Sequence, residues 1–108
     1  MTMKSILISN YGLDIETVAY TNDDLSKKSF IMLMQVSNNA GTTAGVSMWI
    51  TDENNNKLAQ YIPNNTQLGG YAIIGDDGKH VVPPKHKVKF KCSQEGCFFE
   101  LTIKEGLK

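Results

Sequence analysis

The sequence contains no arginine, and this absence bears on the ligands that the chain can recognise. All eleven basic residues are lysines, and eleven Asp and Glu residues balance them, so the formal net charge is zero. Proteins that bind nucleic acids usually carry a basic excess and use arginine for bidentate contacts to phosphate or guanine. We therefore expect no direct binding of DNA or RNA. A net charge near zero does little to keep copies apart, which suits a protein that assembles or sits on a partner.

Long hydrophobic runs are also missing. No apolar stretch approaches the roughly eighteen residues that a membrane-spanning helix needs, so we expect no membrane association. The opening segment, MTMKSILISNYG, has an apolar run of at most about five residues, which is too short for the core of a signal peptide. A cytoplasmic origin is the resulting expectation.

Helical periodicity is absent as well, because no segment keeps apolar residues at i, i+3, i+4 and i+7 for three turns. Short runs instead alternate apolar and polar residues, and clusters of Gly, Asn, Asp and Pro separate them. The pattern predicts a single all-β domain over residues 1–108, a compact antiparallel β-sandwich or flattened barrel of about eight short strands. Residues 1–12 are expected to form an N-terminal arm or an edge strand. The candidate strands are residues 4–9, 15–20, 29–37, 45–51, 57–62, 71–74, 79–82, 86–92 and 97–104.

The most regular alternation lies in KVKFKCSQEGCFFELTIK, residues 87–104. It predicts a hairpin with one apolar face and one polar face, because a shift by one residue would expose every apolar side chain. The four-residue loop 93–96 ends in Gly96, which is free to adopt a left-handed conformation. In this register the facing pairs are Cys92 and Cys97, Phe90 and Phe99, Val88 and Leu101, and His86 and Ile103.

Cysteine is scarce, with only Cys92 and Cys97 in the chain. A structural zinc site needs four ligands, and only His80 and His86 could supplement the two thiols. We therefore predict no metal site and no other cofactor. The two cysteines are expected to form either a disulfide or a buried thiol pair, and a cytoplasmic origin favours the thiols.

Signatures of catalysis or of calcium binding are lacking. Neither histidine stands in a recognisable nucleophile motif, so we predict that the protein is not an enzyme. The segment DENNN, residues 52–56, starts like a calcium loop, but Lys57 stands where Gly is needed and Pro63 where a bidentate Glu belongs. A polar hairpin loop is the expected structure there.

Several apolar residues are candidates for contact with a partner. The strand at 29–37 is apolar on both faces, with Ile31 and Leu33 on one and Met32 and Met34 on the other, so its second face needs a cover. In GVSMWIT the alternation places Trp49 on the outer, polar face, where a large aromatic would be exposed. The predicted contact residues are Met1, Met3, Ile6, Ile8, Met32, Met34 and Trp49.

From Ser29 onward the chain combines a hydrophobic strand ending in VSNN, the strand VSMWI, the segment VVPPKHKVKF and the closing strand LTIKE. This layout resembles the small β-sandwich virion proteins of tailed bacteriophages, of the capsid cement or decoration type. The resemblance implies a non-enzymatic protein that is made in the host cytoplasm, lies on the capsid exterior and stabilises the shell. Its implied partners are the major capsid protein and, at symmetry axes, its own copies.

Two other functions fit the sequence. The chain could be a structural component of the phage neck or tail, which needs the same scaffold. Alternatively, it could be a soluble carbohydrate- or partner-binding module, in which an exposed aromatic such as Trp49, Tyr61 or Tyr71 stacks on the ligand.

Overall fold

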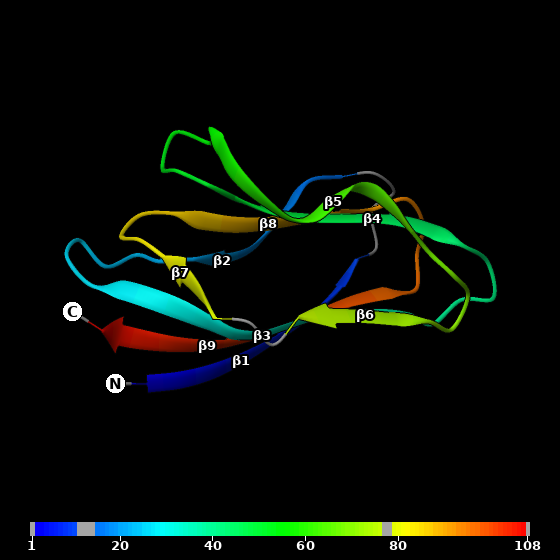
Figure 1. Ribbon diagram of the computed structural model, residues 1–108, viewed down its shortest axis with the longest axis horizontal. Helices are drawn as coiled ribbons and strands as arrows, with labels where there is room; N and C mark the ends of the chain where they lie inside the picture. The colour runs from blue at the N-terminus through cyan, green and yellow to red at the C-terminus, as the bar shows by residue number, and fades with distance from the viewer. Residues whose placement is uncertain (1, 11–14, 77–78, 108) are drawn as a thin grey trace.

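The computed structural model describes residues 2–10, 15–76 and 79–107, and within these residues it has nine strands and no helix. The strands form two antiparallel sheets whose facing sides enclose one core, which confirms the predicted all-β sandwich (Figure 1). The described part of the chain thus contains no helix able to cross a membrane. The strands are β1 (Thr2–Asn10), β2 (Thr17–Thr21), β3 (Lys28–Asn38), β4 (Ala44–Thr51), β5 (Lys57–Leu68), β6 (Ile73–Asp76), β7 (His80–Val82), β8 (Lys87–Cys92) and β9 (Cys97–Leu107).

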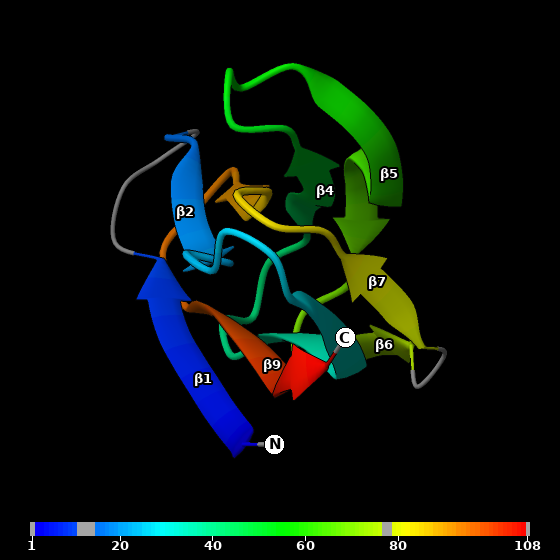
Figure 2. The same cartoon turned by 90° about the vertical axis from the view of Figure 1, so that its left-hand side faces the viewer.

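The two sheets take their strands from the chain in an interleaved order. Sheet A has the order β1-β9-β3-β6, with the short β7 also paired to β3, and sheet B has the order β2-β8-β4-β5. Figure 2 shows the two layers from one end, with β1, β9 and β6 in one layer and β2, β4 and β5 in the other. The chain passes repeatedly from one sheet to the other, and β1 forms an edge of sheet A.

The predicted hairpin of residues 87–104 is wrong in its pairing, because β8 and β9 lie in different sheets. Strand β8 pairs with β2 and β4, whereas β9 pairs with β1 and β3. The apolar side chains still face each other, but across the interior, with the ring centroids of Phe90 and Phe99 3.8 Å apart. Alternation determines which side of a strand is buried, and it leaves open which strand supplies the hydrogen bonds. Residues 93–96 therefore arch between the layers, with Gly96 at φ 95°.

A bulge in β3 changes the predicted faces of that strand. Ile31 is opposite Ile103 on β9, but the next paired residue is Leu33, opposite Thr102, so one residue is unpaired. An extra residue in one strand inverts the alternation beyond it. Met34 consequently points into the core and is buried, and its predicted exposure to a partner is wrong.

The predicted strand at 57–62 is too short, because β5 continues as an edge strand through the segment PNNT at residues 63–66, whose composition is typical of a turn. An edge strand tolerates Pro63 because the missing N–H costs no ladder hydrogen bond on the open side. The pairing register shifts opposite Val46 and Met48, and Asn65 adopts a positive φ of 57°. The expected polar loop at 52–56 is confirmed, with Asp52 Oδ1 accepting hydrogen bonds from the backbone N–H groups of Asn54 and Asn56 at 2.9 and 3.0 Å.

The core lies between the layers, and it includes nearly all the inward positions of the alternating strands. Its largest fully buried side chains are Phe90, Phe99, Ile31, Met34, Met48, Leu101 and Ile103. Complete burial of one such side chain is worth about 1.5–3 kcal/mol, so these positions dominate the stability of a domain of this size.

Candidate interaction surface

The outer face of sheet A, which we call the sheet A face, carries several exposed apolar side chains. Cross-strand register places side chains from five strands on it, because directly opposed residues of neighbouring strands point to the same side. One row across the sheet runs Met3, Lys104, Phe30 and Val81. Two parallel rows run Leu7, Glu100, Gln35 and Gly75, and Phe98, Ser37 and Ile73.

Large apolar side chains in these rows are open to solvent. The exposed fractions are 58% for Met3, 68% for Leu7, 63% for Ile73 and 44% for Val81. Phe30 and Met32 are half-buried, and with Lys79 and Lys104 they line a shallow depression of about 180 Å³. Single exposed apolar residues are ordinary, but a set that spans one sheet face makes that face a candidate surface for a partner.

Strand β1 adds an open edge to this face. It pairs with β9 on one side, and among the described residues no strand pairs with its other side. Unpaired N–H and C=O groups on an edge strand favour addition of another strand unless something covers them. The sheet A face and the β1 edge are therefore continuous and both unoccupied within the described chain.

The N-terminal residues that were predicted to contact a partner differ in their exposure. Met3 is exposed on the sheet A face, whereas Ile6 points inward opposite Leu101 and packs partly buried against the core. Met1 and the side chain of Ile8 lie outside the described part of the structure. Sequence reasoning missed Leu7, although the consecutive apolar residues 6–8 signalled that one of them must point outward.

The prediction that Trp49 is exposed is wrong. Its side chain lies on the outer side of sheet B, as the alternation indicated, but only 3% of the residue is exposed. The ammonium of Lys57 lies 4.7 Å from the centroid of the indole ring, a cation–π contact. The chain itself therefore covers Trp49, which leaves no free aromatic surface there for stacking on a sugar.

The other two aromatics proposed for stacking are in unlike settings. Tyr61 is half-buried, its ring centroid lies 4.7 Å from that of His80, and burial raises the pKa of its hydroxyl to about 12. Tyr71 is largely exposed in the connection between β5 and β6, at a positive φ of 60°.

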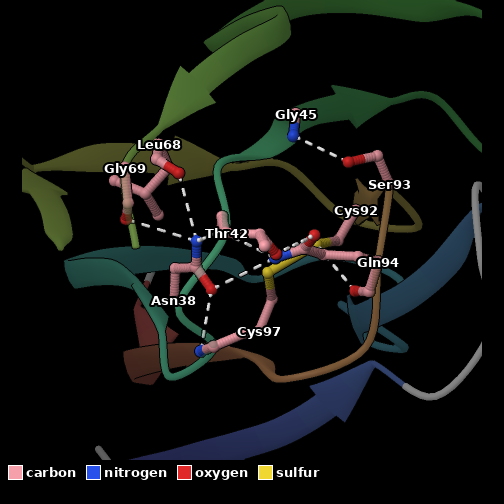
Figure 3. Close-up of a disulfide and its surroundings, with 10 residues drawn as sticks. Asn38, Thr42, Gly45, Leu68, Gly69, Cys92, Ser93, Gln94 and Cys97 are labelled. Atoms are coloured by element: carbon pink, nitrogen blue, oxygen red, sulfur yellow. Dashed lines mark hydrogen bonds between the residues drawn. A yellow bond between two sulfur atoms is a disulfide. The ribbon is translucent and has the colours of Figure 1, made fainter. Parts of the chain in front are cut away.

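One end of the sandwich is closed by a disulfide and a buried amide (Figure 3). Cys92 at the end of β8 and Cys97 at the start of β9 are bonded, which links sheet B to sheet A. Beside them, the buried Asn38 Nδ2 donates to the carbonyl oxygens of Thr42 at 2.8 Å and Leu68 at 3.1 Å. These contacts join the end of β3 to the end of β5, and the disulfide joins the end of β8 to the start of β9.

The other end is joined by a polar cluster around Tyr20 of β2. The Tyr20 hydroxyl donates to Glu105 Oε2 at 2.6 Å and lies 2.7 Å from Ser29 Oγ, which in turn donates to it. Lys4 Nζ lies 3.2 Å from Glu105 Oε1. Burial raises the pKa of Tyr20 above its ordinary value, and the Tyr20 hydrogen bond lowers the pKa of Glu105, with Lys4 acting in the same direction.

The outer face of sheet B is polar by comparison. Lysines 87, 89 and 91 of β8 project from it, and Lys89 Nζ lies 4.0 Å from a carboxylate oxygen of Glu16. Near the start of β4 this face is hollowed by a pocket of about 350 Å³. Within the described residues, no three His, Cys, Asp or Glu side chains gather in a way that could hold a metal ion.

Comparisons with known proteins show a fold and no family. No family model matches the sequence, and no curated protein matches it. Solved structures of infectious bursal disease virus do match. The structure of its T13 particle gives a TM-score of 0.50 at 9% identity, covering 94% of this chain and 30% of that chain. Derived T=1 particles of the D431N mutant VP2 protein give 0.51 at 8% identity, covering 96% and 31%.

The chain thus spans less than a third of the length of the viral chains that it matches. At this level of identity the likeness concerns the fold alone. The β-sandwich of this protein is of a kind that also occurs in the VP2 protein of infectious bursal disease virus.

Proposed function

We propose that the protein is a non-enzymatic structural protein of a virion, a cement or decoration protein that binds the major capsid protein and stabilises the assembled shell. The observation that carries the proposal is the sheet A face, where Met3, Leu7, Ile73 and Val81 are exposed on one regular surface. The fold likeness to viral capsid chains supports it, since the same sandwich is compatible with a place in a shell.

The chemistry of the sheet A face suits a large protein partner better than a small ligand. Its apolar side chains are spread over β1, β3, β6 and β7, and its depression at Phe30 and Met32 is shallow. Lys104 and Glu100 lie among the apolar residues, so the face offers both signs of charge within an apolar surface. Protein interfaces have this composition, with an apolar centre and polar groups that fix orientation.

The proposed partner is a surface that exists on the assembled shell and not on the free capsid subunit. Binding to the shell and not to free subunits stabilises the assembled state by mass action. Copies of this chain would lie on the capsid exterior of a tailed bacteriophage, with contacts between copies at symmetry axes, after synthesis in the host cytoplasm.

Shells of the cognate major capsid protein, prepared without this protein, provide the test. Purified protein should co-sediment with these shells and raise their melting temperature. Its copy number in native particles should approach that of the major capsid protein, whereas a neck or tail component would be present in few copies. Absence of both co-sedimentation and thermal stabilisation contradicts the proposal.

Matched variants identify the surface. Leu7→Glu places a charge on the sheet A face, and Leu25→Glu places the same charge on a loop residue that is 82% exposed. Burying an unpaired carboxylate at an interface is costly, so Leu7→Glu should weaken shell binding at least about tenfold. Leu25→Glu should bind like the wild type. Equal binding by both variants would place the interface elsewhere.

A further inference from the structure

The edges of the two sheets differ in how well they are protected against pairing with another strand. One edge of sheet A consists of β6 and β7, which are only four and three residues long. Sheet B ends at β2, which has five residues and an irregular register, and at β5, which carries Pro63 and a repeatedly shifted register. Short strands, bulges and proline are the features by which natural sheets discourage edge-to-edge pairing.

Strand β1, the remaining edge, lacks these protective features over its described length. It has nine residues from Thr2 to Asn10, without proline or glycine, and its antiparallel register with β9 is continuous. Figure 2 shows β1 at the border of its layer. Alternate residues of an edge strand direct both their N–H and C=O groups away from the sheet. The chemistry of this edge therefore fits a further β-strand.

The outer side chains of β1 are complementary to those of a second β1. Met3, Ser5 and Leu7 are all exposed on the sheet A face, in the order large, small, large. In an antiparallel pair of identical strands, a two-fold axis perpendicular to the sheet passes between two equivalent residues, and opposed residues point to the same side. With this axis at Ser5, Met3 of each copy lies opposite Leu7 of the other, and the two small serines lie opposite each other.

The neighbouring registers are poorer. An axis at Lys4 would set two ammonium groups directly opposite each other, which is destabilising. An axis at Ile6 would set Leu7 opposite Ser5, so that Leu7 would lose its apolar partner. Axes nearer either end of β1 shorten the paired segment. The register centred on Ser5 is therefore the one that combines apolar contacts with separated charges.

The charges of the chain allow this self-association. The formal net charge is zero, so copies repel one another little. The one charged residue of β1 is Lys4, and its ammonium already lies 3.2 Å from a carboxylate oxygen of Glu105. A second copy also carries the same unprotected edge, so a single pairing covers both edges at once.

We propose that two copies of the protein pair antiparallel through β1, with the two-fold axis at Ser5, so that their A sheets join into one continuous sheet. The sheet A faces of both copies then lie on the same side of the joined sheet and form one larger apolar surface. The role of this dimer, in which the joined surface docks on a shell, rests on the proposed function. The pairing itself does not depend on a shell.

Sedimentation equilibrium of the wild-type protein, from about 10 μM to about 1 mM, measures the pairing without any shell. Pairing of two edges buries less surface than a standard interface, so we expect a dissociation constant on the order of 100 μM. Protein that remains monomeric at about 1 mM would overturn the proposal.

Charges placed at the axis test the register. Ser5→Lys and Ser5→Glu each set two like charges opposite each other in a homodimer, so each should weaken dimer formation about fivefold. An equimolar mixture of the two variants should restore the dimer, because unlike charges then lie opposite each other. Ser5 is exposed, so neither variant should change the urea midpoint. Leu25→Lys, on an exposed loop, should dimerise like the wild type. A mixture that dimerises no better than the single variants would overturn the Ser5 register.

Thiol cross-linking distinguishes a second copy from a strand of a shell protein. Cys92 and Cys97 are bonded to each other and fully buried, so an introduced cysteine is the reactive one. With a short bismaleimide, Ser5→Cys should form a covalent dimer in solution, whereas Leu25→Cys should not. Cross-linking of Ser5→Cys to capsid protein alone, with no dimer in solution, would assign the edge to a shell strand and overturn self-pairing. A dimer that does not bind shells would support the pairing and contradict only the proposed function.

Discussion

The two outer faces of the sandwich are built from the same alternation of side chains, yet they differ in how many large apolar side chains they expose. On sheet B, the large aromatic Trp49 is covered by the chain itself, with Lys57 over its ring. On sheet A, the side chains of Met3, Leu7 and Ile73 stay open to solvent. Sheet B adds the lysines of β8 and a polar pocket.

The difference is one of degree, because sheet B exposes Val18 and Leu58 while it covers Trp49. The two faces are thus distinguished by the groups that they present, with more large apolar side chains on sheet A and the lysines of β8 on sheet B. Variants that alter the interior, the links between the layers or one face alone test this division.

The largest effect is expected from the interior that both faces share. Phe99 and Phe98 are adjacent on β9, but Phe99 contacts Phe90 in the core and Phe98 lies on the sheet A face. Phe99→Ala should lower the free energy of unfolding by about 3–5 kcal/mol, because it leaves a cavity. Phe98→Ala should cost clearly less. Urea unfolding followed by circular dichroism measures both, and equal losses would contradict the assignment of the faces.

The next effect concerns the covalent link between the layers. Replacing both Cys92 and Cys97 with alanine should lower the unfolding free energy by about 2 kcal/mol, the value expected for closing so short a loop. Treatment of the wild-type protein with a thiol reductant should lower the urea midpoint in the same direction. If reduction leaves the midpoint unchanged, the disulfide does not stabilise the contact between β8 and β9.

A smaller effect is expected at the opposite end. Tyr20→Phe removes the hydroxyl that bonds to Ser29 and Glu105, and should cost about 1 kcal/mol. Leu25→Ala, at an exposed loop residue, serves as the control and should change stability by less than about 0.5 kcal/mol. Thermal or urea unfolding at neutral pH measures the two differences.

The same cluster predicts how stability depends on pH. The folded-state pKa of Glu105 is lowered, so its contribution is present above the ordinary carboxyl pKa and is lost as the pH falls through the folded value. The folded-state pKa of Tyr20 is raised, so its contribution is present below the ordinary value of 10.0 and is lost as the pH rises beyond it. In urea unfolding across the pH range, Tyr20→Phe should flatten the alkaline loss. If the variant and the wild type lose the same unfolding free energy at alkaline pH, the assignment to Tyr20 is wrong.

Period-two alternation was sufficient to predict the sandwich and most of its strands, because burial of one side is a local property of each strand. It could not predict that β8 and β9 lie in different sheets, since a hairpin and an arch bury the same residues. The bulge that turns Met34 inward was equally hidden, because its cause is the register with β9. A single-sequence pattern does not contain this information.

The candidate sites were harder to predict from the sequence than the fold was. Trp49 was placed on the correct side of its strand, but its cover by Lys57 depends on how β5 curls against β4. The sheet B pocket arises from an irregular strand that resembled a turn in the sequence, PNNT at residues 63–66. The sequence shows which side chains are aromatic, charged or polar, whereas the strand pairing determines which of them become neighbours.

Hydroxyl-radical footprinting of the protein, free and bound to capsid shells, tests the division between the faces most directly. We predict that Met3, Leu7 and Ile73 lose reactivity on binding, while Val18 on sheet B and Leu25 in its loop keep theirs. Unchanged reactivity of Met3, Leu7 and Ile73 in shell-bound protein, or protection of Val18 in their place, would contradict the account.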